Sequence, residues 1–135
     1  MANTVDIDVV QVGPATSETL IRGHRVAVDR PEAKGGDDRG PMGGELLLAG
    51  LGGCFMSNLL AAIRARELRI EGVRTRVSAT LGETPPRFVA IGLAVSAEGE
   101  DLGELGKLVV IAERACIVAN TLRGGVEVSI SAIDK

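Results

Sequence analysis

The chain has 135 residues, of which 45% are hydrophobic, and its formal net charge is −3 at pH 7. That length suits one domain over residues 1–135 with a buried core, and the acidic balance excludes the basic surface of a typical nucleic-acid-binding protein. No apolar run approaches the length needed to span a bilayer, and "MANTVDIDVV" has acids where a signal peptide has bases, so we expect a cytoplasmic protein that does not bind membranes.

The first 29 residues predict a β-hairpin. Apolar and acidic residues alternate in "TVDIDVVQV", which indicates a half-buried strand over residues 4–12. The segment "GPATSE" is typical of a turn, and "TLIRGHRVAVD" predicts the returning strand with Gly23 as a candidate bulge. Residues 30–44 are rich in Gly, Pro and charge and have no period, so we interpret them as a mobile loop over a site.

Residues 45–66 predict the longest helix, and its first half, "ELLLAGLGGCFM", is apolar on nearly every side. A single chain with one other long helix cannot bury such a segment, so we expect a homodimer with this helix at its centre. The glycines at positions 50, 52 and 53 each cost a helix about 1 kcal/mol relative to alanine. They also let a backbone or a ligand approach closely.

The rest of the chain predicts two strands, a second helix and a last strand. The segment "VRTRVSATL" alternates, and "FVAIGLAVSA" returns after the turn "GETPPR". Asp101 and Glu104 have capping-box spacing and open a helix that ends near Ala115. After "ANTLRGG", the segment "VEVSISAI" predicts a strand. This order of elements is typical of an α+β fold with antiparallel sheets packed on helices. The expected inward faces comprise Val73, Thr75, Val77, Ala79 and Leu81 in the strand, and Leu102, Leu105, Leu108, Val109 and Ala112 in the helix.

The chain has two cysteines, Cys54 and Cys116, which in a reducing compartment are either inert core thiols or working ones. If the long helix restarts after the glycines, unpaired N–H groups point at Cys54 and favour its thiolate. If the helix runs straight through, Cys54 gains little from the helix dipole. Cys116 falls at the end of the second helix, where the dipole disfavours a thiolate. That position suits a cysteine that resolves an oxidised Cys54.

Spacing alone favours a structural role for both cysteines, because free cysteine most often behaves as a small buried hydrophobe. Two thiols and the single His24 do not make a closed zinc site. No glycine-rich phosphate-binding motif follows a predicted strand. We therefore expect neither a metal nor a cofactor.

Two longer segments carry a resemblance to a known family. "GGDDRGPMGGELLLAGLGGCFMSNL" and "AERACIVANTLRGGVEV" resemble the OsmC/Ohr family of osmotically induced and organic hydroperoxide resistance proteins, and the chain looks closest to the broader OsmC-like branch. The resemblance covers the order of elements over nearly the whole chain. It implies an OsmC-like α+β fold with a long buried central helix, in an intertwined homodimer with active sites at the subunit interface.

The resemblance also implies thiol peroxidase chemistry in oxidative stress defence. Cys54 would attack an organic hydroperoxide and become a sulfenic acid, and Cys116 would resolve it as an intramolecular disulfide. An external dithiol, a lipoylated protein in the well-described members, would reduce that disulfide. In the family, the catalytic glutamate stands one helix position before Glu45. We take Glu45 as the third candidate catalytic residue. The expected apolar pocket is lined by Leu47, Leu51, Phe55 and Met56.

The sequence departs from the peroxidase pattern at two positions. The first-hairpin turn, "QVGPATSE", has no arginine, and Gly44 stands where the peroxidase members have glutamate. None of the nearby arginines, at positions 22, 25, 30 and 39, maps onto the family's catalytic one. An alternative function is therefore a non-catalytic module that binds a small apolar ligand in the dimer cleft. A third reading makes both cysteines core fillers, which requires their sulfur atoms to be far apart.

Overall fold

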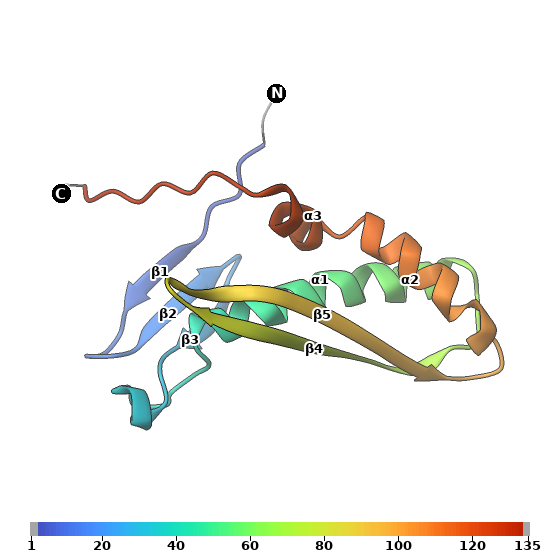
Figure 1. Ribbon diagram of the computed structural model, residues 1–135, viewed down its shortest axis with the longest axis horizontal. Coiled ribbons are helices and arrows are strands. Elements are labelled where there is room, and N and C mark those ends of the chain that lie inside the picture. Colours follow the sequence, from blue (N-terminus) through green and yellow to red (C-terminus); the bar gives the residue numbers. More distant parts are fainter. Residues whose placement is uncertain (1–2, 134–135) are drawn as a thin grey trace. The chain divides into compact units, whose positions relative to one another are not determined.

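The computed structural model describes residues 3–133 (Figure 1). Its elements, in chain order, are β1 (Asp8–Gln11), β2 (Ser17–Ile21), β3 (His24–Val28), η1 (Glu32–Lys34), α1 (Gly43–Ala65), β4 (Glu71–Glu83), β5 (Pro86–Glu98), η2 (Leu102–Glu104), α2 (Leu105–Arg114) and α3 (Ile117–Gly124). The chain forms two compact units, divided after Leu47 in the first turns of α1. We refer to the described residues 3–47 as the N-terminal unit and to 48–133 as the C-terminal unit.

The N-terminal unit contains a three-stranded antiparallel sheet in the order β1-β2-β3. The expected returning strand is wrong as a single element, because it is itself a hairpin in which Ile21 pairs with His24. Arg22 and Gly23 form the two-residue turn, with φ of 48° and 85°. Gly23 is therefore a turn residue and not a bulge, since such tight hairpins require positive φ at both central positions. β1 is an edge strand, and Val9 on it is 57% exposed, so the expected half-burial is not observed.

The loop that follows β3 is organised around the buried carboxylate of Asp29. The Thr16 hydroxyl donates to Asp29 Oδ2 at 2.7 Å, and the backbone N–H groups of Arg30, Asp37 and Arg39 also donate to this carboxylate. The loop includes the short helix η1, which the sequence pattern does not predict. A Cβ on Gly36 would lie 2.1 Å from the Arg30 carbonyl oxygen, so the loop closes only with glycine there. The segment is therefore a folded loop held by hydrogen bonds to one side chain.

The C-terminal unit packs the β4–β5 hairpin along α1, with α2 completing the core (Figure 1). The expected strands and their antiparallel pairing are confirmed. Leu81 is an exception: it is 68% exposed, because a register shift between Thr80 and Leu81 interrupts the alternation. The buried core consists of Leu51, Phe55, Leu59, Ala62, Ile63, Ile70, Leu108, Ala112 and Cys116.

One of the three helix glycines explains the close approach of α1 to the hairpin. A Cβ on Gly52 would lie 2.9 Å from Val77 Cγ2 on β4, whereas a Cβ on Gly50 or Gly53 would meet no atom within 4 Å. Gly52 therefore permits a contact within the unit. Gly50 and Gly53 lie on exposed parts of the helix, so the expected burial of α1 on every side is not observed in the single chain.

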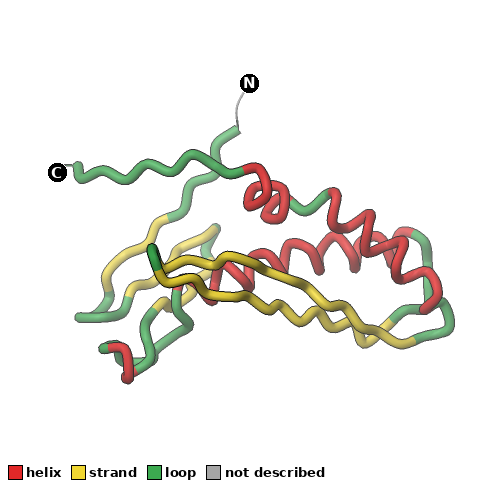
Figure 2. The backbone as a smooth tube through the Cα atoms, viewed as in Figure 1, coloured by secondary structure: helices red, strands yellow, loops and turns green. Residues whose placement is uncertain are grey.

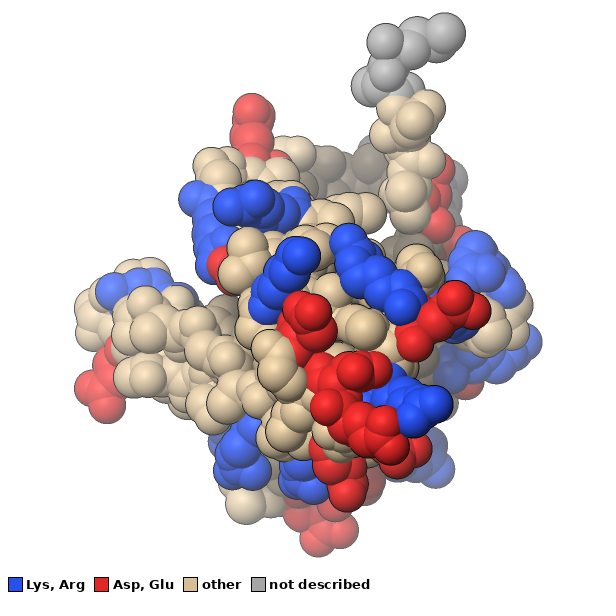
Figure 3. Space-filling model, turned by 90° about the vertical axis from the view of Figure 1, so that its right-hand side faces the viewer, with Lys and Arg blue, Asp and Glu red and all other residues tan. Residues whose placement is uncertain are grey.

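At 23 residues, α1 is long enough and apolar enough to cross a membrane by length and composition. The expectation that no segment approaches that length is therefore wrong. The buried side chains of α1 pack against β5 and α2 in the core. Such packing is typical of a core helix in a small soluble domain, and 33% of the apolar window of α1 is buried in the single chain. On the face shown in Figure 3, acidic and basic side chains are interspersed, as is usual for such a domain.

The second predicted helix begins with η2, and its regular part is α2. The expected capping box is absent: Asp101 makes no side-chain cap, and its Oδ2 instead accepts a hydrogen bond from the Arg69 backbone N–H at 2.7 Å. Leu102 is consequently outside the core, at 41% exposed.

The predicted last strand is also wrong for the single chain, since residues 125–133 form no strand (Figure 2). The helix α3 has no counterpart among the elements predicted from the sequence.

Candidate active site

Cys54 lies in the middle of α1 and is half-buried. The helix runs without a break through Gly52 and Gly53, so the geometry in which it restarts before the thiol is excluded. The dipole of α1 therefore contributes little to the ionisation of Cys54, because its effect is confined to the terminal turns. Any stabilisation of the thiolate has to come from another element.

That element is α3, and its N-cap residue is Cys116. The Cys116 sulfur accepts a hydrogen bond from the Ala119 backbone N–H at 3.5 Å, which satisfies one of the free donors of the first turn. Cys54, Val118 and Ala119 pack against the core that contains Cys116. The groups that influence the ionisation of Cys54 are the backbone N–H groups of Val118 and Ile117 and the Cys116 thiol. The structure thus brings the two cysteines together, and the reading in which they are distant core fillers does not fit it.

The two thiols have opposite pKa shifts. The N–H groups of α3, led by that of Val118, together with the Cys116 thiol lower the pKa of Cys54 below its ordinary value, against an opposing effect of burial. Burial raises the pKa of Cys116, and the neighbouring Cys54 adds to that effect. The expected direction for Cys116 therefore holds. Cys116 directly follows Ala115, the C-cap of α2, as expected, but it also caps α3, and burial is the main cause of its raised pKa.

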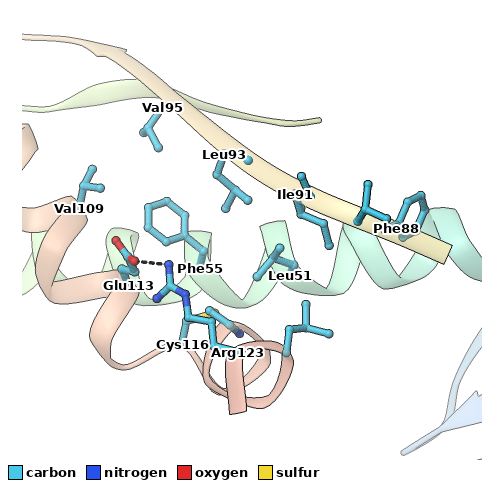
Figure 4. Close-up of a pocket in the computed structure, with 15 residues that line it drawn as sticks. Leu51, Phe55, Phe88, Ile91, Leu93, Val95, Val109, Glu113, Cys116 and Arg123 are labelled. Atoms are coloured by element: carbon cyan, nitrogen blue, oxygen red, sulfur yellow. Dashed lines mark hydrogen bonds and ion pairs between the residues drawn. The ribbon is translucent and has the colours of Figure 1, made fainter. Parts of the chain in front are cut away.

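A cavity of about 610 Å³ adjoins the buried thiol: Cys116 forms part of its wall, whereas Cys54 does not line it (Figure 4). Its lining is mostly apolar side chains from α1 and β5. Of the four residues expected to line a pocket, Leu51 and Phe55 do so, whereas Leu47 and Met56 do not. Met56 follows Phe55 by about 100° around the helix. Its sulfur accepts a hydrogen bond from the Thr75 hydroxyl at 3.9 Å, away from the lining.

The charged residues of the cavity wall are Glu113 and Arg123. Arg123 Nη2 donates to Glu113 Oε2 at 2.5 Å, which joins the end of α2 to the end of α3 (Figure 4). This ion pair was not predicted from the sequence, because α3, which carries Arg123, was not predicted. A signal was available, since Arg123 followed by Gly124 and Gly125 is a typical helix C-terminus.

Glu45, the third candidate catalytic residue, lies in the first turn of α1 within the N-terminal unit. Its Oε1 accepts a hydrogen bond from the Met42 backbone N–H at 2.8 Å, which is a helix-capping contact. Its catalytic role stays a prediction. Within residues 3–133, no three His, Cys, Asp or Glu side chains gather in a way that would hold a metal ion.

This arrangement can carry out two-step thiol redox chemistry. Cys54 is partly exposed and is held in an environment that favours its thiolate, which is the nucleophilic form of cysteine. Cys116 is buried against it and its pKa is raised, which makes Cys116 the weaker nucleophile of the two. An oxidised Cys54 would therefore find a second thiol already in contact.

Comparisons with known proteins identify the family of this chain. The sequence profile of the OsmC-like protein family matches residues 35–131. An organic hydroperoxide resistance protein from Xanthomonas axonopodis pv. citri (strain 306) is 30% identical over 99 residues, which are 72% of this chain and 68% of that relative. These matches establish the family, and they link the chain to hydroperoxide resistance in redox stress.

Solved structures have the same fold. An OsmC-like protein from Mycoplasma pneumoniae superposes with a TM-score of 0.77 at 18% identity, over 92% of this chain and 90% of that one. An organic hydroperoxide resistance protein OsmC from Legionella pneumophila superposes with a TM-score of 0.64 at 23% identity, over 92% of both chains. The α+β architecture with antiparallel sheets is therefore confirmed.

Proposed function

The chain belongs to the OsmC-like protein family, and from that premise we propose that it is a cysteine-based peroxidase that reduces organic hydroperoxides in oxidative stress defence. One observation carries the proposal. The partly exposed Cys54 thiol packs beside the buried thiol of Cys116 at the start of α3, and the N–H groups of that first turn lower the pKa of Cys54. An ordinary pair of core thiols has no need of such donors.

In the first step, the Cys54 thiolate attacks one oxygen of the hydroperoxide. The S–O bond forms as the O–O bond breaks, and the departing alkoxide takes a proton to become the alcohol. Cys54 is thereby oxidised to a sulfenic acid. Cys54 suits this role better than Cys116, because it is the more exposed thiol and because its pKa is the lowered one.

In the second step, Cys116 attacks the sulfur of the Cys54 sulfenic acid. The S–S bond forms, the S–O bond breaks, and the hydroxide leaves as water with the proton of Cys116. An external dithiol then reduces the disulfide and is itself oxidised to a disulfide. A lipoylated protein is the reductant that we propose, because its dithiol supplies both electrons in one molecule.

The cavity supports organic over hydrogen peroxide as substrate. Its walls are mainly apolar side chains, such as Leu51, Phe55 and Ile91, which favour an alkyl or aryl group over water. Its volume of about 610 Å³ is that of a small-molecule site. A peroxide whose organic part enters this cavity would lie against Cys116, the neighbour of Cys54.

We propose that the active protein is an intertwined homodimer in the cytoplasm. Support comes from apolar surface that the single chain leaves uncovered. Val126, Val128 and Ile130 alternate along the segment after α3 and are all exposed, Ile130 at 94%. A segment with this pattern is suited to pairing as a strand. The exposed Gly50 and Gly53 would also let a second copy approach α1 closely.

The experiment mixes reduced protein with one equivalent of cumene hydroperoxide and counts free thiols. We expect both thiols to disappear in the unsubstituted chain. In Cys116→Ser, Cys54 should stop at the sulfenic acid, which a dimedone probe labels. In Cys54→Ser, the Cys116 thiol should persist. Dihydrolipoamide, as a dithiol, should restore both thiols of the oxidised chain.

The rate of the first step should follow the ionisation of Cys54. Because the pKa of Cys54 is below the ordinary value of 9.0, oxidation should reach its maximal rate at a lower pH than that of a free cysteine peptide. Survival of both thiols after equimolar peroxide would refute the proposal. Native mass spectrometry that finds an apolar ligand retained equally by Cys54→Ser would then favour the non-catalytic binding module.

A further inference from the structure

We propose that Glu113 and Arg123 are positioning residues whose ion pair holds α3 so that its first turn faces Cys54. The inference rests on the proposed function only in taking Cys54 as the reactive thiol. Glu113 lies in the last turns of α2 and Arg123 in the last turn of α3. Their contact, at 2.5 Å, closes the elbow between the two helices (Figure 4).

Other contacts hold α3 weakly, which gives the ion pair its importance. No residue of α3 is fully buried, and only Val118 and Ala119 pack against the core. One further hydrogen bond crosses the elbow, from Asn120 Nδ2 to the Arg114 carbonyl oxygen at 3.2 Å. Packing alone therefore leaves the direction of this short helix loosely fixed.

The two ends of α3 are anchored differently. At its N-terminal end, Cys116 is fully buried in the core and caps the first turn. At its C-terminal end, about 12 Å along the axis for eight residues, Arg123 is tied to Glu113. Two anchors at opposite ends fix the axis of a helix, whereas one anchor lets it pivot. A pivot of α3 would turn the N–H groups of Ile117 and Val118, which lower the pKa of Cys54, relative to that thiol, and interactions of this kind weaken steeply with angle.

A positioning role is separable from a structural one here. The Arg123 and Glu113 side chains are 65% and 43% exposed, and ion pairs at such positions add little to the stability of a fold. Variants of either residue should therefore fold normally. The ion pair between Arg69 and Glu100, also exposed and in the same unit, provides a matched control outside the cavity wall and the α2–α3 elbow.

The test measures the alkylation of Cys54 by iodoacetamide as a function of pH, in a Cys116→Ser background. Serine retains the N-cap of α3, since its hydroxyl is a preferred capping group. We expect Arg123→Gln and Glu113→Gln each to slow alkylation at pH 7 by about two- to fivefold, which is the usual size of a helix-terminus effect on a charge. The midpoint of the profile should rise in both variants.

The direction of the Glu113→Gln effect separates positioning from simple charge. Removal of a carboxylate near a thiolate would by itself speed alkylation, because it removes a repulsive charge. Slower alkylation in both single variants, with recovery in the exchanged pair Glu113→Arg and Arg123→Glu, supports positioning. Shifts in opposite directions, or rates equal to that of Arg69→Gln, would overturn it. Alkylation needs no peroxide. This test therefore still decides the positioning role of the ion pair if the peroxidase assay fails.

Discussion

The N-terminal and C-terminal units of this chain are stabilised by different kinds of interaction. In the N-terminal unit, the buried carboxylate of Asp29 accepts hydrogen bonds from the Thr16 hydroxyl and from three backbone N–H groups. In the C-terminal unit, α1, α2 and β5 meet in an apolar core in which Leu59, Leu108 and Cys116 are completely buried. The loop of the first unit is organised by one side chain, and the core of the second unit depends on packed volume.

This difference indicates how each unit responds to change. Hydrogen bonds to Asp29 are directional, so they fix the path of the loop and leave no room for a side chain at Gly36 or Gly40, where a Cβ would lie 2.1 Å and 2.3 Å from a carbonyl oxygen. Apolar packing is not directional but is sensitive to lost volume. Acid should therefore act first on the N-terminal unit, and core truncation on the C-terminal unit.

The largest effect should come from Leu108→Ala. Leu108 is 1% exposed, and truncation of a buried leucine removes packing and leaves a cavity at a cost of about 2–5 kcal/mol. Leu102→Ala is the matched control, because Leu102 is 41% exposed, and it should cost less than about 0.5 kcal/mol. Urea unfolding followed by circular dichroism gives both values.

Hydrogen exchange sharpens this prediction. In Leu108→Ala, the amides of α1, α2 and β5 should lose protection, while those of β2 and β3 should keep theirs. An equal loss in β2 and β3 would show that the units open together, and the comparison between them would then fail.

Hydrophobic periodicity predicted most of the C-terminal unit, because its elements bury one regular face. The long helix from residue 45 was placed within two residues of the observed start at Gly43, and the alternation of Val73, Thr75 and Val77 indicated β4. The Asp29 loop was not predictable in this way. Its hydrogen-bond donors come from positions 16, 30, 37 and 39, and a set spread so widely forms no local pattern.

The candidate site was predictable in its residues but not in its geometry. The family resemblance pointed to Cys54 and Cys116, and the structure places their thiols together. The helix that serves them was missed, because cysteine is not among the preferred N-cap residues and because α3 buries no residue that would give a period. The cause of the low pKa of Cys54 therefore could not be read from the sequence.

A smaller effect, confined to the N-terminal unit, is expected on acidification. The Thr16 hydroxyl, followed by the backbone N–H groups, holds the pKa of Asp29 below its ordinary value of 3.8. A lowered carboxyl pKa adds stability that is fully present above the unfolded value and is lost as the pH falls through the folded value. Exchange protection in residues 29–41 should therefore fall below about pH 3.8, while that of α2 persists.

Asp29→Asn provides the control for this prediction. An amide nitrogen cannot accept the N–H hydrogen bonds that the carboxylate accepts, so protection of the loop should already be reduced at pH 7. The exchange protection of the loop in this variant should also no longer depend on pH in the acid range. Equal acid sensitivity of the variant and the unsubstituted chain would show that another carboxyl group is responsible.

The smallest effect concerns neighbouring glycines in α1, and it compares two faces of one helix. In Gly52→Ala the new methyl group would lie 2.9 Å from Val77 Cγ2, and the resulting overpacking should outweigh the gain in helix propensity. We expect a net loss of about 1 kcal/mol in the free energy of unfolding. Gly53→Ala meets no atom within 4 Å in the single chain, so alanine should add about 1 kcal/mol of stability to a dissociated protomer.

Protein concentration decides what covers the Gly53 face. If a second copy packs against it, Gly53→Ala should weaken the dimer in sedimentation velocity while it stabilises the protomer at high dilution, since the methyl group occupies space that the partner needs. Gly52→Ala should destabilise the protein at every concentration, because the contact of Gly52 with Val77 lies within one chain. A loss of stability in Gly53→Ala at high dilution would show that Gly53 also makes a close contact within the chain, which would contradict this prediction.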